Sequence, residues 1–596
     1  MRSSFLEFNI AASGLFASQT ALNIVSNNIS NANTAGYSKQ VVKQQATMPL
    51  SSSNGSGMVG TGTEVLGIEQ IRDLYLDTKY WSQNSKLGES GVKNEMLTKI
   101  QMLFNEPSDY GINTTLNNFF NSLEDLSKDT SDESYYSSVK EAAMSLVSFF
   151  NETSNSLTAY QDELNGEVKI KVDQINSIAS QIKSLNEQIY KFEVDGSTAN
   201  DLRDQRALLV DDLSKIVDVE VEEVEINSNL KNGVYNATDK SKSDKHYVVK
   251  INGQILVNHF DANELEVAPR KYKSNPEDTK GLYNIKWDTG LPLNTQGLGG
   301  ELKACLDLRD GNNGNIFTGG VGSVDLINKR VTVGSISRAD IQNEGILRIG
   351  SKDMEYSSYT YDETTNQITF QLLDTTGIIV GDNVSIGSEN DYKGIPHYIN
   401  KLNKFVRTFA SAFNEGTYSD GTKIDGLTGN VGGYSADGST GNYIFTYNKT
   451  GKGTFTDYND ITAANFSLSK EFIDNSRVIA TSTKADSGES DNEIINQFLT
   501  IKDNGSLFKE GKVLDFVASI IGEMAVDAKY SENYQDIQTS IVNTITNQRL
   551  STSGVDLNEE MTSMVRYQSA YNAAARMITV IDEIYDTTIN NMGARG

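Results

Sequence analysis

The sequence predicts a multidomain α+β protein with three parts. Helices from the N- and C-termini form a coiled-coil layer, long helices form a bundle domain, and all-β domains are inserted into that bundle. The first observation is that apolar residues recur every seven positions near both ends of the chain. This spacing places one apolar stripe along a helix, which a partner helix must cover. The second is that, between the ends, segments in which apolar residues have helical spacing alternate with short segments in which every second residue is apolar, as in a β-strand.

The two terminal helices are predicted over about residues 4–31 and from Asp556 onward. Asp556 can cap the C-terminal helix, Glu559 has the spacing of a capping box, and Gly593 suits the helix end. We interpret the heptad positions of both helices as the residues through which the chain assembles. They are Phe8, Leu15, Leu22, Ile29, Leu557, Met564, Tyr571, Ile578, Tyr585 and Met592.

One apolar seam is too weak to order either terminal helix within a single molecule. Each seam residue contributes roughly 1.5–3 kcal/mol when buried, whereas ordering the backbone costs about 1–2 kcal/mol per residue. Both helices also carry alanines off the seam, and a helix that is apolar on several sides needs several neighbours. We therefore expect the ends to pack laterally in a tube or ring. An intramolecular hairpin that never assembles is the alternative.

The helical domain is predicted from proline-free stretches, because proline breaks helix interiors. No proline lies between Pro107 and Pro269 or after Pro396. We expect a helix over about residues 73–103, two more before Asn155, and a further one over 161–192. The last helix carries an apolar seam made of two parallel lines of residues at heptad positions a and d. One line is Ile175, Ile182 and Ile189, and the other is Ile178, Leu185 and Phe192.

After the helical stretch, apolar and polar residues begin to alternate, which predicts β-strands. Val217, Val219 and Val221 alternate with acidic residues, and a bulge near Glu222 accounts for the change of phase that follows. Asn252-Gly253 between two apolar runs predicts a hairpin over residues 247–257. Residues 297–310 are predicted as a helix.

Two β-rich insertions are predicted further on. Strands are expected at 345–349, 354–361, 367–373 and 383–386, followed by a helix over 395–413. A second, glycine-rich insertion has a hairpin signal at 443–455. Helices resume over about 513–527 and 534–550.

These elements give a nested domain organisation. Residues 1–49 and 551–596 form the terminal coiled-coil assembly domain, and residues 50–72 form a Ser/Gly-rich linker. The helical domain comprises residues 73–310, 393–416 and 471–550, with β-hairpins attached over 217–297. Residues 311–392 form the inserted β-domain, and 417–470 form the second, small β-rich insertion.

Composition excludes several classes of protein. The 596 residues carry a net charge of −27, which disfavours binding to nucleic acid or to an anionic membrane surface. The single cysteine, Cys305, excludes disulfides within the chain, and we interpret it as a small buried hydrophobe. Glu7 and Asn9 interrupt the apolar core that a cleavable signal peptide would need. No apolar run is long enough to span a membrane.

The sequence holds no convincing enzyme site. The three histidines are isolated, no Walker loop is present, and residues 307–315 lack the closing glutamate of a calcium loop. We therefore predict a protein that is not an enzyme and has no metal site and no cofactor.

Motifs at the two ends resemble those of the bacterial flagellar rod, hook and hook-associated proteins. At the N-terminus the resemblance rests on Ser13–Leu15, Gln19–Leu22 and Ser26–Gln40, within which Asn33, Thr34, Gly36, Tyr37 and Ser38 are closest to the hook-associated members. At the C-terminus the resemblance rests on residues 553–560, on Tyr567-Gln568 and on residues 570–576. Residues 175–192 and 199–206 are similar to the helical domain of the hook-associated members.

The resemblance implies a structural subunit that forms a ring at the junction between hook and flagellin filament. Its partners would be further copies of itself, the hook protein, a second hook-associated junction protein next to the filament, and a cytoplasmic export chaperone on the C-terminal helix. It would leave the cytoplasm unfolded through the flagellar type III export channel and act outside the cell. The alternatives are another axial protein, of the hook or rod, a surface adhesin acting through the β-insertions, and a hydrolase within residues 311–470.

Overall fold

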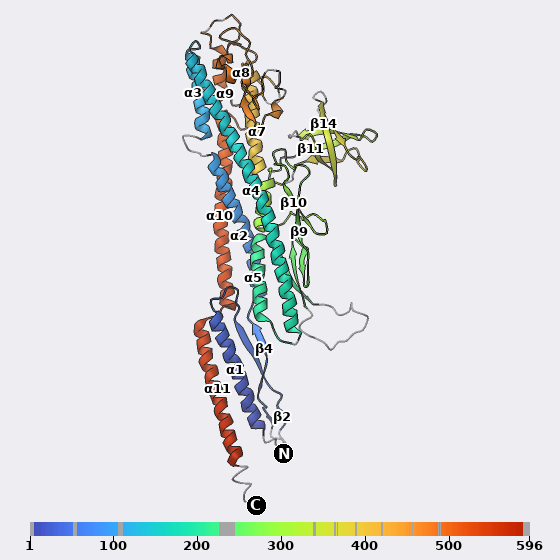
Figure 1. Ribbon diagram of the computed structural model, residues 1–596, viewed down its shortest axis with the longest axis vertical. Helices are drawn as coiled ribbons and strands as arrows, with labels where there is room; N and C mark the ends of the chain where they lie inside the picture. Colours follow the sequence, from blue (N-terminus) through green and yellow to red (C-terminus); the bar gives the residue numbers. More distant parts are fainter. Residues whose placement is uncertain are drawn as a thin grey trace, which may run out of the picture.

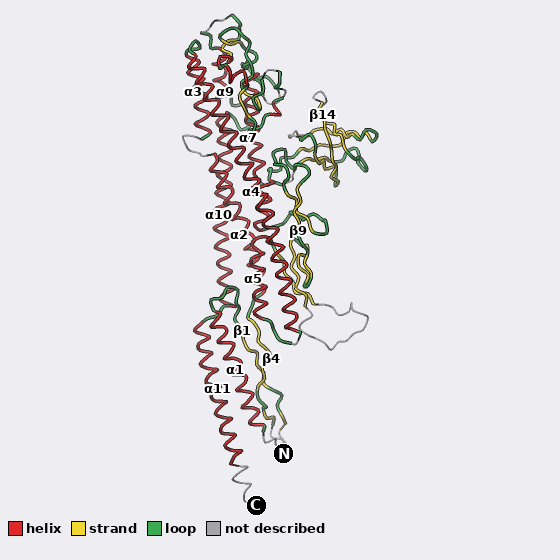
Figure 2. Tube along the Cα trace, in the orientation of Figure 1, coloured by secondary structure: helices red, strands yellow, loops and turns green. Residues whose placement is uncertain are grey.

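The protein is described by a computed structural model over residues 5–587, except for residues 52–56, 105–110, 195, 226–244, 338–340, 363–364, 366, 388–389, 419–420, 452, 456, 487 and 489. The molecule is elongated, and its long helices run along the long axis (Figure 1). A layer built from the two terminal helices lies at one end of this rod. A small mixed lobe lies at the other end, and a β-domain projects from one side. Figure 2 shows most strands gathered on that same side.

The terminal layer consists of two antiparallel helices and a β-ribbon. The helices are α1 (Leu6–Asn31) and α11 (Leu557–Asp586). The rings of Phe5 and Tyr585 lie 5.7 Å apart at one end of the pair, and Asn28 donates a hydrogen bond to Glu560 at the other. Two nested strand pairs form the ribbon: β1 (Gln40–Ala46) with β4 (Thr63–Gln70), and β2 (Leu50–Ser51) with β3 (Met58–Val59).

The ribbon differs from the linker predicted over residues 50–72. β1 pairs with β4 from Gln40↔Gln70 to Ala46↔Thr63, with a shift of register between Lys43 and Gln44. Residues 50–51, 58–59 and 63–70 of the predicted linker are therefore strands of a hairpin. Apolar and polar residues do not alternate strictly in these strands, so the sequence gave no strand signal here.

The rod contains two helices that are longer than predicted. α4 runs without a break from Glu133 to Glu193, and α10 runs from Val513 to Ser553. The expected interruptions at about residues 155–160 and 528–533 are wrong. Neither stretch contains Gly or Pro, and Leu157 and Ala528 continue the buried face of each helix. The remaining helices are α2 (Leu74–Phe104), α3 (Ile112–Lys128), α5 (Asn200–Ile216), α6 (Gly300–Asp310), α7 (Ile395–Glu415), α8 (Lys470–Asp474) and α9 (Glu493–Asp503).

The predicted seam of α4 is buried only in part. Ile175, Ile182 and Ile189 are buried, and so is Leu185. The second line ends there, because Phe192 is 62% exposed. The seam packs within the helical domain.

Two small sheets lie against the rod. One has the order β5-β6-β7-β8, with β5 (Val219–Glu225), β6 (Lys245–Ile251), β7 (Gln254–Asn258) and β8 (Asp261–Ala262); the other pairs β9 (Leu265–Pro269) with β10 (Tyr283–Trp287). The hairpin at Asn252-Gly253 is confirmed, and both residues have the positive φ of its turn, 46° and 75°. The bulge near Glu222 is wrong, since β5 pairs with β6 without a shift from Val219 to Glu225.

The β6–β7 hairpin gives folding a pH dependence through His259, whose ring stacks on His246 at 4.5 Å. Burial lowers the pKa of His259 to about 4, and His246 and Arg206 act in the same direction. The unfolded chain therefore binds a proton first as pH falls. We expect roughly 1–2 kcal/mol of stability, fully present above pH 6.5, to be lost as pH falls from 6.5 to 4. Amide exchange of β6 and β7 at pH 7 and pH 4.5 measures this loss.

The matched variant for this prediction is His259→Asn. Asparagine tolerates the left-handed backbone of this position, where φ is 55°, and it does not titrate. We expect the variant to lose the extra exchange at pH 4.5. An unchanged pH dependence in the variant would contradict the assignment to His259.

The projecting β-domain is a closed barrel between α6 and α7. Its strand order is β11-β12-β15-β14-β13-β16, and it has its own hydrophobic core. All four strands predicted here are present, and the insertion of this β-domain between two helices is confirmed. The strands are β11 (Phe317–Asp325), β12 (Arg330–Ser337), β13 (Gly345–Ile349), β14 (Lys352–Asp362), β15 (Gln367–Leu372) and β16 (Asn383–Ile386).

The second β-rich segment is not a separate insertion. The Phe445 ring lies 5.3 Å from that of Phe409 of α7, and the Phe466 ring lies 6.0 Å from that of Phe150 of α4. Residues 417–470 therefore share the main core of the rod. The hairpin predicted at 443–455 is also wrong. Asn448 and Lys449 adopt the positive φ of a turn, but β18 (Phe445–Tyr447) pairs with β19 (Phe466–Leu468). β17 (Tyr434–Ser435) likewise pairs with the distant β20 (Ala480–Ser482).

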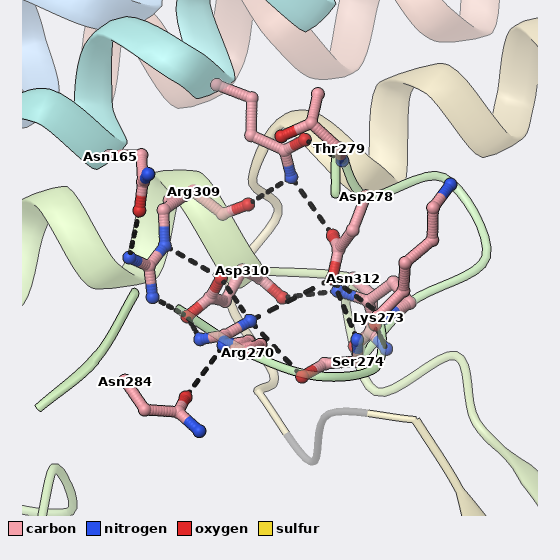
Figure 3. Close-up of polar contacts among 12 residues, drawn as sticks. Asn165, Arg270, Lys273, Ser274, Asp278, Thr279, Asn284, Arg309, Asp310 and Asn312 are labelled. Atoms are coloured by element: carbon pink, nitrogen blue, oxygen red, sulfur yellow. Dashed lines mark hydrogen bonds and ion pairs between the residues drawn. The ribbon is translucent and has the colours of Figure 1, made fainter. Parts of the chain in front are cut away.

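A buried charged cluster fixes the root of the barrel to the rod (Figure 3). The guanidinium of Arg309 is fully buried and donates to both carboxylate oxygens of Asp310, at 2.9 and 2.7 Å. Arg270 donates to the same two oxygens at 3.1 and 2.7 Å. Asp278 accepts a hydrogen bond from Gln161 of α4. Although burial alone would raise the pKa of Asp310, the two guanidinium groups hold it below its usual range.

Candidate assembly surface and neck

The predicted heptad residues of α11 lie on the face that this helix turns to α1. Met564, Tyr571, Ile578 and Tyr585 are all half-buried. Glu560 and Ile581, which are buried, lie on the adjoining line of the same face. Leu557 is exposed at the helix start. Met592 and Gly593 lie outside the described residues.

The predicted heptad residues of α1 are not its buried ones. Leu15, Leu22 and Ile29 are half-buried, and Phe8 is exposed. The buried positions are small or polar: Ala11, Ala17, Ser18, Ala21, Val25 and Asn28. The physical reason is that α1 lies between two neighbours, α11 and the ribbon. The backbone N–H of Thr63 donates to Ser13 Oγ, and Gln44 donates to the carbonyl of Ala17. Small side chains let both neighbours approach, which leaves the large ones at the margins.

Large apolar side chains also point outward from both terminal helices. Phe16 is 66% exposed on α1, and Val565 is 64% exposed on α11. Further exposed residues of α11 are Met561, Met577, Val580 and Ile584. Met561 and Val565 are four positions apart, and Met577, Val580 and Ile584 follow at spacings of three and four. They form two exposed apolar groups that sequence reasoning missed because it followed the stronger heptad. Exposed apolar groups of this kind mark protein interaction surfaces.

The terminal layer is also nearly free of charge on its N-terminal side. No Asp, Glu, Lys or Arg occurs from Phe8 to Ser38, although 22% of the chain is charged. Copies of a chain with a net charge of −27 repel one another. A surface without charge is therefore where such copies can approach closely.

The motif residues lie at the neck, where the terminal layer joins the rod. Asn33 and Thr34 are exposed in the turn after α1. Gly36 has φ of +76°, and a Cβ there would lie 3.3 Å from Cβ of Leu208. Tyr37 donates to Asn28 Oδ1 at 2.8 Å. Burial, with added repulsion from Asp201, Asp204 and Glu560, raises the pKa of Tyr37 to about 12, so it remains a hydrogen-bond donor at neutral pH.

Polar contacts hold the neck in place. Ser38 donates twice to Asp204 of α5, from its backbone N–H at 2.9 Å and its hydroxyl at 2.8 Å. Lys39 pairs with Glu559 at 3.0 Å and with Glu560 at 3.1 Å, and its backbone N–H donates to Ser553. Burial lowers the pKa of Lys39, but its hydrogen bonds to the two glutamates outweigh this and raise the pKa overall. The neck thus joins α1, α5 and α11.

Replacing Asp204 with alanine is expected to loosen the neck by about 2–3 kcal/mol. The substitution leaves the buried backbone N–H and hydroxyl of Ser38 without their acceptor. Faster amide exchange in residues 38–46 measures the effect. Asp212→Ala, exposed further along the same helix, is the control and should change exchange by less than about 1 kcal/mol. Equal effects of the two substitutions would contradict the role of Asp204.

The key neck residues were not predicted as a site. Asn28, Asp204 and Glu560 lie within motifs that carry the family resemblance, but the sequence gave no reason to connect them. Asp204 lies 166 residues from Ser38, and Glu560 lies 532 residues from Asn28. Proximity of such residues becomes visible only in the folded chain.

Within the described parts of the chain, no group of His, Cys, Asp or Glu residues is arranged to hold a metal ion. Cys305 is buried, and burial raises its pKa to about 12, as expected of a small core residue. Among the helices described, none is both long and apolar enough to cross a lipid bilayer.

Comparisons with known families match the terminal helices and the rod. Models of the flagella basal body rod protein and of the flagellar basal body rod FlgEFG protein C-terminal region match residues 8–37 and 542–592. A model of the flagellar hook-associated protein FlgK helical domain matches residues 97–317. A rod carried on paired terminal helices, with these matches, defines a structural protein of the bacterial flagellar axis.

Curated relatives identify the family within this class. The chain is 32% identical over 605 residues to flagellar hook-associated protein 1 of Bacillus subtilis (strain 168), covering all of both chains. It is 28% identical over 597 residues to the protein of that name from Salmonella typhimurium, covering 98% of this chain and 99% of the relative. The chain therefore belongs to the flagellar hook-associated protein 1 family.

A solved structure of the flagellar hook junction protein FlgK from Burkholderia pseudomallei aligns with a TM-score of 0.46 and 17% identity. It covers 80% of this chain and 100% of that one.

Proposed function

We propose that this chain forms the ring that joins the flagellar hook to the flagellin filament. The observation that carries the proposal is the terminal layer, whose helices keep apolar residues on faces that the single molecule does not cover. Phe16 on α1 and Val565 on α11 are exposed on these faces. Neighbouring copies, the hook protein and a second junction protein would cover these faces.

The decisive experiment is electron microscopy of flagella from a strain that lacks this chain. We expect hooks without filaments, with flagellin shed into the medium. Full-length filaments on the deletion strain would overturn the proposed function. Restoring the gene provides the control, because filaments should return.

The terminal helices should gain order on assembly. Neither α1 nor α11 packs its outward apolar residues within the subunit, so we expect both to exchange amides quickly in dilute monomer and slowly in assembled flagella. Near-complete protection of residues 8–30 and 557–587 in the monomer would refute this.

We also propose the route by which the chain reaches its place outside the cell. It leaves the cytoplasm unfolded through the flagellar type III channel, after a cytoplasmic chaperone has covered α11. The exposed side chains of Met561, Val565 and Met577 would otherwise bring copies together too early. A chain that ends at Gly554 lacks α11 and should lose chaperone affinity. Equal affinity for the full-length and shortened chains would dispose of this step.

The domain division that we propose follows the contacts of the structure. The terminal assembly layer includes the ribbon of β1–β4 in addition to residues 1–49 and 551–596, because α1 packs on the ribbon. The barrel within residues 311–392 forms an inserted domain with its own core. Residues 417–470 belong to the helical domain, with which they share a core.

A further inference from the structure

The lower half of α10, from Ile537 to Ser553, presents an outward face that carries no charge. Ile537, Asn543, Asn547 and Leu550 are all exposed on it. Arg549 is the one Asp, Glu, Lys or Arg in this stretch. We call the exposed side chains between Ile537 and Thr552 the uncharged strip.

Arg549 does not reach the uncharged strip, because it is turned into the rod. Its guanidinium contacts Asp77 at 2.8 Å and Asp211 at 2.9 Å, and it lies 4.4 Å from the ring centre of Tyr80. The outward face of this half-helix is therefore left to Thr, Ser, Asn, Gln, Ile and Leu.

The absence of charge is local to this part of the rod. The upper half of the same helix carries charges at Asp515, Glu523, Asp527, Lys529, Glu532 and Asp536. On α4, which is longer at 61 residues against 41 for α10, charged residues such as Asp173 and Lys191 are exposed. A solvated helix of this protein normally carries charge, and the uncharged strip does not.

The uncharged strip adjoins the surface already assigned to assembly. In Figure 1, α10 follows one edge of the rod, and α11 continues below it. The carbonyl of Ser553, at the end of α10, accepts a hydrogen bond from the backbone of Lys39 in the neck. The strip thus lies directly above the terminal layer, in which α1 carries no charge from Phe8 to Asn31.

We propose that the uncharged strip packs against a second copy of this chain and so extends lateral contact between neighbouring subunits from the terminal helices into the rod. This inference rests on the proposed ring function. Charged residues are depleted where interface cores form. Two copies that each carry a net charge of −27 repel each other least where their surfaces carry no charge. In a ring, contacts are heterologous, so the strip meets a different face of its neighbour.

Adding charge to the uncharged strip tests the proposal. The double substitution Asn543→Glu with Asn547→Glu places two carboxylates one helical turn apart on an exposed face, where the monomer can solvate them. We expect at least tenfold less incorporation into flagella, with unchanged helicity and melting temperature of the monomer. The matched control is Ser180→Glu with Ser184→Glu, exposed at the same spacing on α4, which should incorporate normally. Normal incorporation of the α10 variant would overturn the proposal.

Photocrosslinking in intact flagella identifies the occupant of the strip. Benzoylphenylalanine is placed at Asn543 and, in a separate chain, at Gln548, and the adducts are identified by mass spectrometry. An adduct with a second copy of this chain supports the proposal. An adduct with a different axial protein, or no adduct from incorporated subunits, overturns it. If the unmodified chain itself fails to enter flagella, the proposed function fails instead.

Discussion

Replacing Leu15 or Ile578 with aspartate is expected to abolish incorporation into flagella, with a loss of at least 100-fold, while the free subunit stays folded. Both side chains are half-buried in the monomer, so a carboxylate there can still reach water. We expect neighbouring subunits to cover the part of each side chain that the monomer leaves exposed, where an unpaired buried charge costs several kcal/mol. A 100-fold loss corresponds to about 2.7 kcal/mol. Co-sedimentation with purified hooks and swimming in soft agar measure the effect.

Conservative variants at the same positions are the controls. Leu15→Met and Ile578→Val keep an apolar side chain and should retain incorporation within a few-fold. Circular dichroism of each purified monomer checks that the aspartate variants remain helical. Normal motility of either aspartate strain would count heavily against assembly through the terminal helices.

Replacing Asp310 with alanine is expected to destabilise the root of the barrel by about 3–5 kcal/mol. The carboxylate accepts two hydrogen bonds from Arg309 and two from Arg270. Its removal leaves the fully buried Arg309 guanidinium without its counter-charge. Amide exchange over α6 and residues 270–280 should accelerate. The urea concentration at the midpoint of unfolding of this region should fall.

The control for Asp310 is a pair of the same type on the barrel surface. Arg348 and Asp353 form a salt bridge at 2.9 Å, with both side chains about half exposed. Asp353→Ala should therefore change stability by less than about 1 kcal/mol. If both aspartates gave equally small effects, the cluster at the barrel root would not stabilise the fold.

Local patterns were sufficient to predict most elements. Heptad spacing predicted α1 and α11, the Asn252-Gly253 pair predicted the β6–β7 turn, and alternation predicted four strands of the barrel. Each of these signals is contained in a short segment, because helix period and turn conformation depend on neighbouring residues. The same locality explains the failures at α4 and α10, where weak stretches were read as breaks although burial holds the helix together.

Pairing between distant segments was beyond the sequence. β18 was expected to pair within residues 443–455, but its partner is β19, and the ribbon of β1 and β4 was read as a linker. On α1, the large heptad residues were expected at the centre of the seam, whereas Ala17 and Ala21 are buried there. Which face of an apolar helix is covered depends on how many neighbours it has, and periodicity alone does not count them.

The sequence by itself determined that this chain has helical ends with apolar heptad spacing, a long helical rod and an inserted β-domain. It did so because apolar period, turn residues and charge are written locally along the chain. Only the tertiary structure decided which residues build the neck. With 79 acidic residues in the chain, no local pattern singles out Asp204 for Ser38 or Glu560 for Lys39. These pairs form because packing brings α1, α5 and α11 to one place, where burial requires each donor and charge to find a partner.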